Sequence, residues 1–147
     1  MNNPKPVTTS VALVIYNEDR SKFLIVKRPK DDSDMAGHWG FPAASKKDIA
    51  EEWEDTIKRA AKNKLGVDVE IVEMLGEDTI DRGKYVLVLR DYEARIIAGE
   101  PVVPQAVEGV TQYVEQKWTD DVTDLKKSAK EGSLCSRVFL RANNINW

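Results

Sequence analysis

One amphipathic helix, predicted over residues 49–65, constrains the fold of this chain more than any other feature. Asp48 and Glu51 resemble a capping box at its start, with Asp in place of the usual Ser or Thr, and Gly66 follows its last turn. At ~100° per residue, the apolar side chains of this segment fall on one broad arc. They are Trp53, Ile57, Ala60, Ala61 and Leu65. We therefore expect a core packed against this face of the helix.

Segments with the composition of β-strands lie on both sides of the helix. Residues 7–16 and 22–28 are rich in β-branched and apolar side chains, and the turn-forming sequence NEDRS between them predicts a hairpin. After the helix, residues 67–75, 84–97 and 110–118 are predicted to be strands. The chain therefore contains enough strands for a sheet, with one helix inserted among them.

The order of elements predicts the fold class. Two further helices are expected over residues 120–131 and 134–143, and loops over residues 29–37 and 98–109. We predict an α+β fold of the α/β/α sandwich type, in which helices flank a mixed β-sheet. The sequence has no internal repeat and no linker, so we expect a single domain over residues 1–147.

Composition limits the classes of function. The chain has 25 acidic and 22 basic residues, and the short basic run VKRPK is better explained as a solvated loop than as a nucleic-acid patch. No apolar run reaches the ~20 residues that span a bilayer. The single cysteine, Cys135, and the single histidine, His38, exclude an internal disulfide and a Cys/His zinc site. We expect a cytoplasmic protein with a small-molecule ligand and no nucleic-acid or membrane partner, and a homodimer is left open.

Residues 45–67 carry a family resemblance. They resemble the Nudix box, G-x5-E-x7-R-E-U-x-E-E-x-G-U with U apolar, and the sequence WGFP before them fits the same family. In this register Ser45 takes the first glycine, Glu51 the first glutamate, Arg59 the arginine and Gly66 the second glycine. In the family the glutamate and arginine shape the loop. The resemblance implies a Nudix (MutT-like) fold and a pyrophosphatase-type hydrolase acting on nucleoside diphosphates linked to another moiety.

The resemblance also implies Mg²⁺ or Mn²⁺, held by the glutamates of R-E-U-x-E-E. Carboxylates three and four residues apart converge on one helix face and supply hard oxygen ligands for Mg²⁺. Here these positions are Ala60, Asn63 and Lys64, so the box is degenerate, and Lys64 falls within the apolar arc of the helix. A lysine ammonium ~4 Å from a cation costs about 4 kcal/mol per pair of unit charges. Metal binding in the usual position is not expected.

Two functions from different classes follow. The first is a divergent hydrolase whose Mg²⁺ or Mn²⁺ is held by Glu51, Glu54 and Glu108, with Glu51 and Glu108 as catalytic residues. The second is an inactive Nudix domain that needs no metal and binds a nucleotide or diphosphate through Lys64, or serves as an interaction module. Further candidates for ligand binding are Arg59, Asn63, His38 and Trp39.

The candidate site residues have structural interpretations as well. Lys64 lies in the last helical turn, where the macrodipole favours a cation whatever its function. His38 could donate to phosphate or act as a general base, and Trp39 could stack on a base, but such residues at strand edges are more often structural. Glu108 lies in a proline-rich loop, where a solvent-facing carboxylate is equally expected. The sequence leaves these alternatives open.

Overall fold

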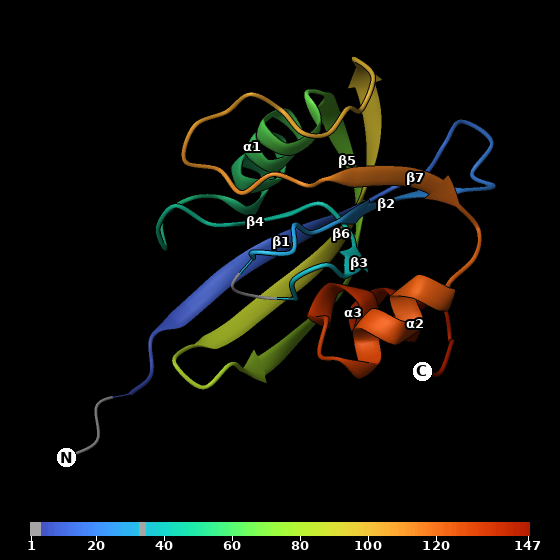
Figure 1. Ribbon diagram of the computed structural model, residues 1–147. Coiled ribbons are helices and arrows are strands. Elements are labelled where there is room, and N and C mark those ends of the chain that lie inside the picture. Colours follow the sequence, from blue (N-terminus) through green and yellow to red (C-terminus); the bar gives the residue numbers. More distant parts are fainter. Residues whose placement is uncertain (1–3, 33–34) are drawn as a thin grey trace.

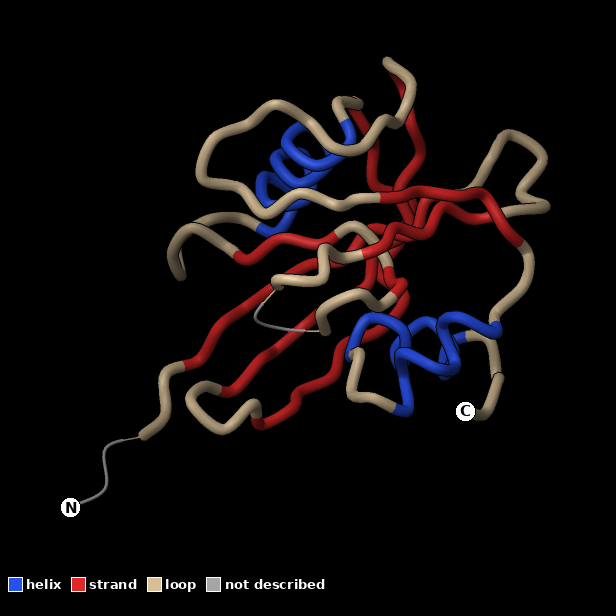
Figure 2. Tube along the Cα trace, in the orientation of Figure 1, coloured by secondary structure: helices blue, strands red, loops and turns tan. Residues whose placement is uncertain are grey.

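The computed structural model describes residues 4–32 and 35–147, which form two β-sheets and three helices (Figures 1 and 2). One sheet has the strand order β4-β1-β6-β5 and the other β3-β2-β7. The strands are β1 (Val7–Ile15), β2 (Phe23–Lys27), β3 (Trp39–Gly40), β4 (Ala43–Ser45), β5 (Asp68–Asp81), β6 (Val86–Ala98) and β7 (Glu115–Thr119). The helices are α1 (Trp53–Leu65), α2 (Thr123–Lys130) and α3 (Leu134–Ala142). The predicted α+β class is confirmed.

The four-stranded sheet is mixed, as expected. Strand β1 runs parallel to β6, from Val7 opposite Val86 to Ile15 opposite Ala94, and antiparallel to β4. Strand β5 pairs antiparallel with β6 along most of its length, with register shifts at three places. Such shifts bend a strand and increase its twist. Strand β5 contacts both α1 and α3.

The predicted hairpin between residues 7–16 and 22–28 is wrong. Strand β1 belongs to the four-stranded sheet and β2 to the three-stranded sheet, and within the described chain the only pairing between the two segments is one isolated bridge, Tyr16 to Phe23. From Val11 onward β1 is apolar on both faces, and so is β2 up to Val26, which is typical of strands buried between layers. The turn sequence fixes the chain reversal, but it does not fix which partner each strand takes.

The boundaries of α1 differ from the prediction at one end only. The helix begins at Trp53, because the Asp48 carboxylate accepts the backbone N–H groups two and three residues further on in a separate turn. Glu52, the residue before the helix, makes no side-chain cap. At the other end Gly66 takes the left-handed conformation, with φ of 74°, as predicted.

Two predicted strands change length. Strand β5 extends to Asp81, and the strand predicted over residues 110–118 is shortened to β7, because residues 111 and 112 bond to α1 instead. We call residues 99–114 the β6–β7 loop. Residues 33 and 34, within the loop predicted over residues 29–37, lie outside the described part of the chain. No helix in the described part is both long enough and apolar enough to cross a bilayer.

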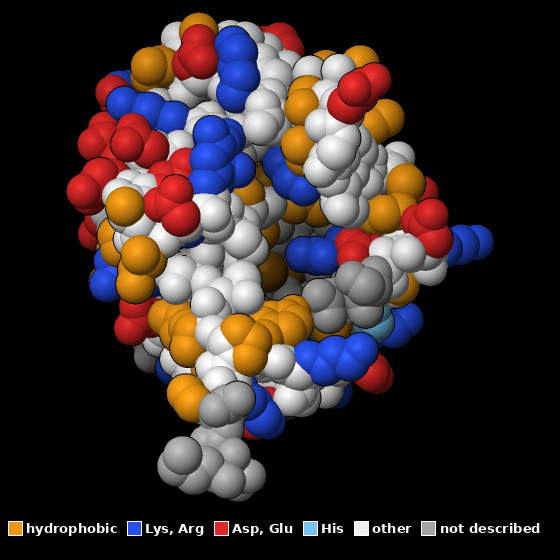
Figure 3. Space-filling view, turned by 90° about the vertical axis from the view of Figure 1, so that its left-hand side faces the viewer, with side chains coloured by type: hydrophobic (Ala, Val, Ile, Leu, Met, Phe, Trp, Pro, Cys, Tyr) orange, Lys and Arg blue, Asp and Glu red, His pale blue; other side chains and the backbone are white. Residues whose placement is uncertain are grey.

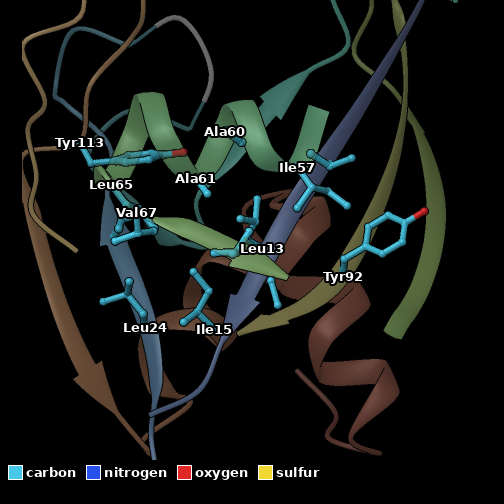
Figure 4. Close-up of a cluster of buried hydrophobic side chains, with 14 residues drawn as sticks. Leu13, Ile15, Leu24, Ile57, Ala60, Ala61, Leu65, Val67, Tyr92 and Tyr113 are labelled. Atoms are coloured by element: carbon cyan, nitrogen blue, oxygen red, sulfur yellow. The ribbon is translucent and has the colours of Figure 1, made fainter. Parts of the chain in front are cut away.

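Two hydrophobic clusters cover opposite faces of the four-stranded sheet. The first lies under α1 (Figure 4) and includes Leu13, Leu24, Ile57, Leu65 and Val67. The second lies under α2 and α3 and includes Ala12, Phe23, Phe41, Leu125 and Phe139. Strand β2 contributes to both clusters, so the two sheets share their cores. Three layers result: helix α1, the two sheets, and the helix pair α2 and α3. This arrangement agrees with the predicted sandwich.

Candidate ligand-binding site

Helix α1 carries the three positions at which the family has metal-binding glutamates. Ala60 is 1% exposed and packs in the first core, Asn63 is half-buried, and Lys64 is 9% exposed. The prediction that Lys64 lies on the apolar side of the helix is confirmed by this burial. A lysine in such a place needs hydrogen-bond acceptors for its ammonium group, because a buried charge without partners is costly.

The Lys64 ammonium has one acceptor in the described structure, the backbone carbonyl of Thr111. Its Nζ atom also lies 5.2 Å from the centre of the Tyr113 ring, within range of a cation–π interaction. Burial, followed by the neighbouring Arg28 guanidinium, lowers the pKa of Lys64 to about 8, and Asp32 opposes this shift. An ammonium carries three donors, so Lys64 retains N–H groups for a further acceptor.

Lys64 lines a cavity of about 280 Å³. Its wall is built from β1, β4, the start of β6, the segment after β2, the β5–β6 turn and the end of α1. Figure 3 shows a hollow on this side of the molecule, with Lys and Arg side chains beside it and hydrophobic side chains at its base. The charged side chains of the wall are Arg28, Asp32, Lys64 and Arg82.

The charges in this wall are unbalanced. Arg28 Nη1 lies 2.8 Å from Asp32 Oδ2, and this ion pair is neutral as a unit. Lys64 and Arg82 have no acidic partner in residues 4–32 and 35–147. The Nε atom of Arg82 is buried and has no hydrogen-bond partner there. The wall therefore carries two positive charges that no carboxylate of the described residues neutralises.

A second, narrower cavity adjoins the first and shares Arg28 and Arg82 with it. His38 and Trp39, both predicted site residues, line this inner cavity rather than the Lys64 cavity. One face of the Trp39 ring is covered by Lys117, whose Nζ lies 4.5 Å from the ring centre. Base stacking on that face would require Lys117 to move.

Glu51 and Arg59 are in contact, as their spacing predicted. The Glu51 carboxylate accepts Arg59 Nε at 3.2 Å and Nη2 at 2.8 Å, and also Thr56 Oγ1 and the backbone N–H of Lys47. Arg59 in turn donates to the carbonyl of Ser45 at 2.7 Å. The bonds from Arg59 contribute most to lowering the pKa of Glu51 to about 2. This pair ties the segment before α1 to the helix.

The other two candidate metal ligands lie elsewhere. Glu54 is exposed and pairs with Lys58 at 3.0 Å, and Glu108 is exposed in the β6–β7 loop. Among the residues that the structure describes, no three His, Cys, Asp or Glu side chains gather closely enough to hold a metal ion. Mg²⁺ and Mn²⁺ require several oxygen ligands, so this donor set does not fit them. The predicted metal site of Glu51, Glu54 and Glu108 is not assembled, and their catalytic roles stay predictions.

The β6–β7 loop is held against α1 by its own hydrogen bonds. The Gln112 side chain donates to the carbonyl of Asn63 at 3.1 Å and accepts the backbone N–H of Gln105 at 2.8 Å. The bond from Lys64 to Thr111 adds a second link. Asn63 thus contributes a backbone carbonyl to the loop contact, and its predicted role in ligand binding is untested.

The cavity contains two cations that the sequence analysis did not select. Arg28 belongs to the basic run that was interpreted as a solvated loop, and Arg82 lies in the turn between β5 and β6. Both reach the site through tertiary contacts between segments far apart in the sequence. No local pattern could have found Arg82, because a single arginine in a turn is ordinary.

The fold and the Glu51–Arg59 pair define a Nudix-type domain. Residues 6–122 match the family model described as NUDIX domain, so the chain belongs to this family. Similar solved structures include the MutT protein from Methanosarcina mazei Go1, with a TM-score of 0.69, 18% identity and 97% of each chain covered. A NUDIX hydrolase from Nitrosomonas europaea has a TM-score of 0.70 at 14% identity, covering 95% of this chain and 89% of that one.

A third similar structure is an ADP-ribose pyrophosphatase from Streptococcus suis 89-1591. Its TM-score is 0.58 at 20% identity, with 92% of this chain and 91% of that chain covered. No curated protein sequence matches the chain significantly. At these identities the similar structures show the fold alone, and the ligand must be argued from the site.

Proposed function

We propose that this Nudix domain binds a phosphate-bearing small molecule of the nucleotide type in the Lys64 cavity, without a divalent metal ion and without hydrolysing it. One observation carries the proposal. Lys64 and Arg82 line the same cavity, and neither has an acidic partner among the described residues. Two cations on one cavity wall, partly removed from water and without an acidic partner, favour an anionic ligand.

Phosphoryl oxygens suit these two donors. Hydrogen bonds between ionised partners are shorter and stronger than neutral ones, and both lysine and arginine are common phosphate ligands in proteins. Lys64 keeps N–H donors beyond its bond to Thr111, and Arg82 brings its guanidinium group to the same cavity wall. The ligand class also agrees with the name of the Streptococcus suis structure, which points to a nucleoside diphosphate derivative as the substrate of that protein.

The residues of α1 support the proposed absence of turnover. Hydrolysis in this family depends on metal ions that polarise the phosphoryl group and activate water. Ala60, Asn63 and Lys64 supply no carboxylate at the positions that would hold those ions. A ligand bound here is therefore expected to dissociate without having been hydrolysed.

A binding and cleavage panel tests the proposal. Nucleoside diphosphate sugars, dinucleoside polyphosphates and nucleoside triphosphates are each measured by calorimetry and by product analysis, with Mg²⁺, with Mn²⁺ and with EDTA. We expect binding that survives EDTA and weakens at least about tenfold in Lys64→Met, since charge-assisted bonds are lost. Lys62→Met, which removes an exposed lysine from the same helical turn, is the matched control. Binding of no compound, or equal loss in both variants, would overturn the proposal.

The relocated-metal hydrolase remains the second candidate function. The observation in its favour is that Glu108 lies in a loop anchored to α1 and makes no bond that restrains its carboxylate in the described structure. This candidate predicts metal-dependent product that disappears in Glu108→Gln. The same panel decides between the two functions. Product that forms with Mg²⁺ or Mn²⁺, and does not form with EDTA, would support the hydrolase and contradict the binding domain.

A further inference from the structure

We propose that the Lys64 cavity recognises a single dianionic phosphoryl group, as in a phosphomonoester or inorganic phosphate, in preference to a diphosphate. This inference rests on the proposed function and narrows its ligand. Three features of the cavity wall carry it: the cations Lys64 and Arg82, the hydroxyls of Ser10 and Ser45, and the carboxylate of Asp32.

The net charge of the wall matches one phosphoryl dianion. Arg28 and Asp32 neutralise each other at 2.8 Å, which leaves the positive charges of Lys64 and Arg82. A terminal phosphoryl group carries about −1.5 to −2 at pH 7 on three acceptor oxygens. A group of this kind neutralises both cations within one cavity of about 280 Å³ and needs no metal ion to do so.

Further donors face the same cavity. Ser10 Oγ and Ser45 Oγ lie 2.9 Å apart at its wall, and since only one hydroxyl donates to the other, the second keeps its proton for another acceptor. Lys64 and the Arg82 guanidinium line the same cavity, so together with this hydroxyl they give donors for three terminal oxygens. Three non-bridging oxygens on one phosphorus are found in a terminal phosphoryl group such as that of a monoester, whereas each phosphoryl group of a diphosphate sugar has only two.

Asp32 disfavours a second phosphoryl group. Its carboxylate lines the cavity and lies close enough to Lys64 to influence the pKa of that lysine. Because Asp32 already occupies the Arg28 guanidinium, no unpaired cation among the described wall residues remains to balance the second phosphoryl group of a diphosphate. Like charges in a site that is partly removed from water repel more strongly than in bulk solvent.

The titration of Lys64 gives the inference a distinctive pH dependence. The second ionisation of a phosphomonoester lies near pH ~6, so affinity rises as pH increases through that value. The pKa of Lys64 is about 8, so affinity falls again as pH rises through 8 and the ammonium is lost. The groups that face Lys64 are Arg28 and Asp32 after β2, Arg59 on α1, Arg82 in the β5–β6 turn and Tyr113 before β7. Burial raises the pKa of Tyr113 to about 12, outside this range.

Calorimetry between pH 6 and pH 9 with EDTA present tests the inference. The probes are inorganic phosphate, a nucleoside monophosphate and a diphosphate sugar of the same nucleoside. We expect the monophosphate to bind at least tenfold more tightly than the diphosphate sugar, with a maximum in affinity between pH 6 and pH 8. Lys64→Arg keeps the cation but does not titrate, so it should bind at pH 7 within a few-fold of wild type and lose the decline above pH 8. Lys62→Met should leave the whole profile unchanged.

The outcomes separate this inference from the function on which it rests. A diphosphate sugar that binds as tightly as the monophosphate overturns the inference and leaves metal-independent binding standing. Failure of all three probes overturns both. Equal affinity for inorganic phosphate and the monophosphate supports recognition of the phosphoryl group alone. A wild-type profile that stays flat above pH 8 overturns the role of Lys64.

Discussion

Asp91 is a fully buried acid in the middle of strand β6, and neither oxygen of its carboxyl group has a hydrogen-bond partner in the described structure. It pairs with Ala12 on β1 and shares the sheet face of that residue, which belongs to the core under α2 and α3. Burial raises the pKa of Asp91 well above its usual value. Burial, and then Asp91, raise the pKa of the Cys135 thiol. Asp91→Asn preserves the size of the side chain and removes its titration.

The raised pKa makes stability fall as pH rises. Between the unfolded pKa of about 3.9 and the higher folded pKa, the folded chain holds a proton that the unfolded chain has released. Within this window the free energy of unfolding decreases by about 1.4 kcal/mol per pH unit, and above the folded pKa it decreases no further. A typical domain has only about 5–15 kcal/mol of net stability, so one pH unit gives a measurable change.

Urea unfolding followed by tryptophan fluorescence measures this change. Wild type and Asp91→Asn are compared at pH 5, 5.5 and 6, so that all other titrating groups cancel in the difference. With a urea dependence of about 1–3 kcal/mol per molar, the midpoint of wild type should fall by roughly 0.5–1.4 M more per pH unit than that of the variant.

Parallel pH profiles for the two proteins would refute the reasoning. They would mean that Asp91 is ionised in the folded state, with a partner or with access to water. A variant less stable than wild type by the same amount at every pH would assign Asp91 a structural hydrogen bond rather than a buried proton.

Three further predictions concern the scaffold of the site. Glu51→Gln should lower the free energy of unfolding by about 1–3 kcal/mol at pH 7, because the charge-assisted bonds to Arg59 are weakened. The pKa of Glu51 is about 2 in the folded chain, so this loss should shrink as pH falls from 4 toward 2. Thermal unfolding at pH 7 and pH 3 checks this. Gly99→Ala should destabilise more than Gly83→Ala in urea: both have positive φ, but only the new Cβ at Gly99 meets a backbone atom, the Gly66 carbonyl oxygen, at 3.0 Å. Ala60→Glu should cost about 3–5 kcal/mol in thermal unfolding, since the added carboxylate is buried without a partner; a stable variant would show that this face is open.

Much of the fold could be predicted from local patterns. The apolar arc of α1, its end at Gly66 and the strand composition on both sides depend on neighbouring residues, so the sequence contains them. The partner of β1 could not be predicted, because its apolar residues suit a neighbour on either side and the choice of β6 is made by long-range packing. Helix α1 begins later than predicted because the Asp48 carboxylate caps a separate turn before it. The sequence pattern of such a turn is the same as that of a capped helix start.

The site was predictable only in part, for the same reason. The contact between Glu51 and Arg59 follows from two helical turns of spacing, and the burial of Lys64 follows from the helical wheel. Arg82 and Lys64 line one cavity because of how the β5–β6 ribbon bends over the sheet, which no short segment encodes. The acceptor for Lys64, on Thr111, lies 47 positions away in the sequence.

The links from α1 to the β6–β7 loop also bear on the speed of binding. Lys64 and the carbonyl of Asn63 hold Thr111 and Gln112 in place before any ligand arrives. The conformational entropy of this loop is therefore lost when the chain folds, and association has no ordering step to wait for. Encounter should then be limited by diffusion and electrostatic steering, and differences in affinity between ligands should appear in their residence times. If binding needs no metal, as proposed, occupancy of the site in a cell should follow ligand concentration and be insensitive to changes in free magnesium.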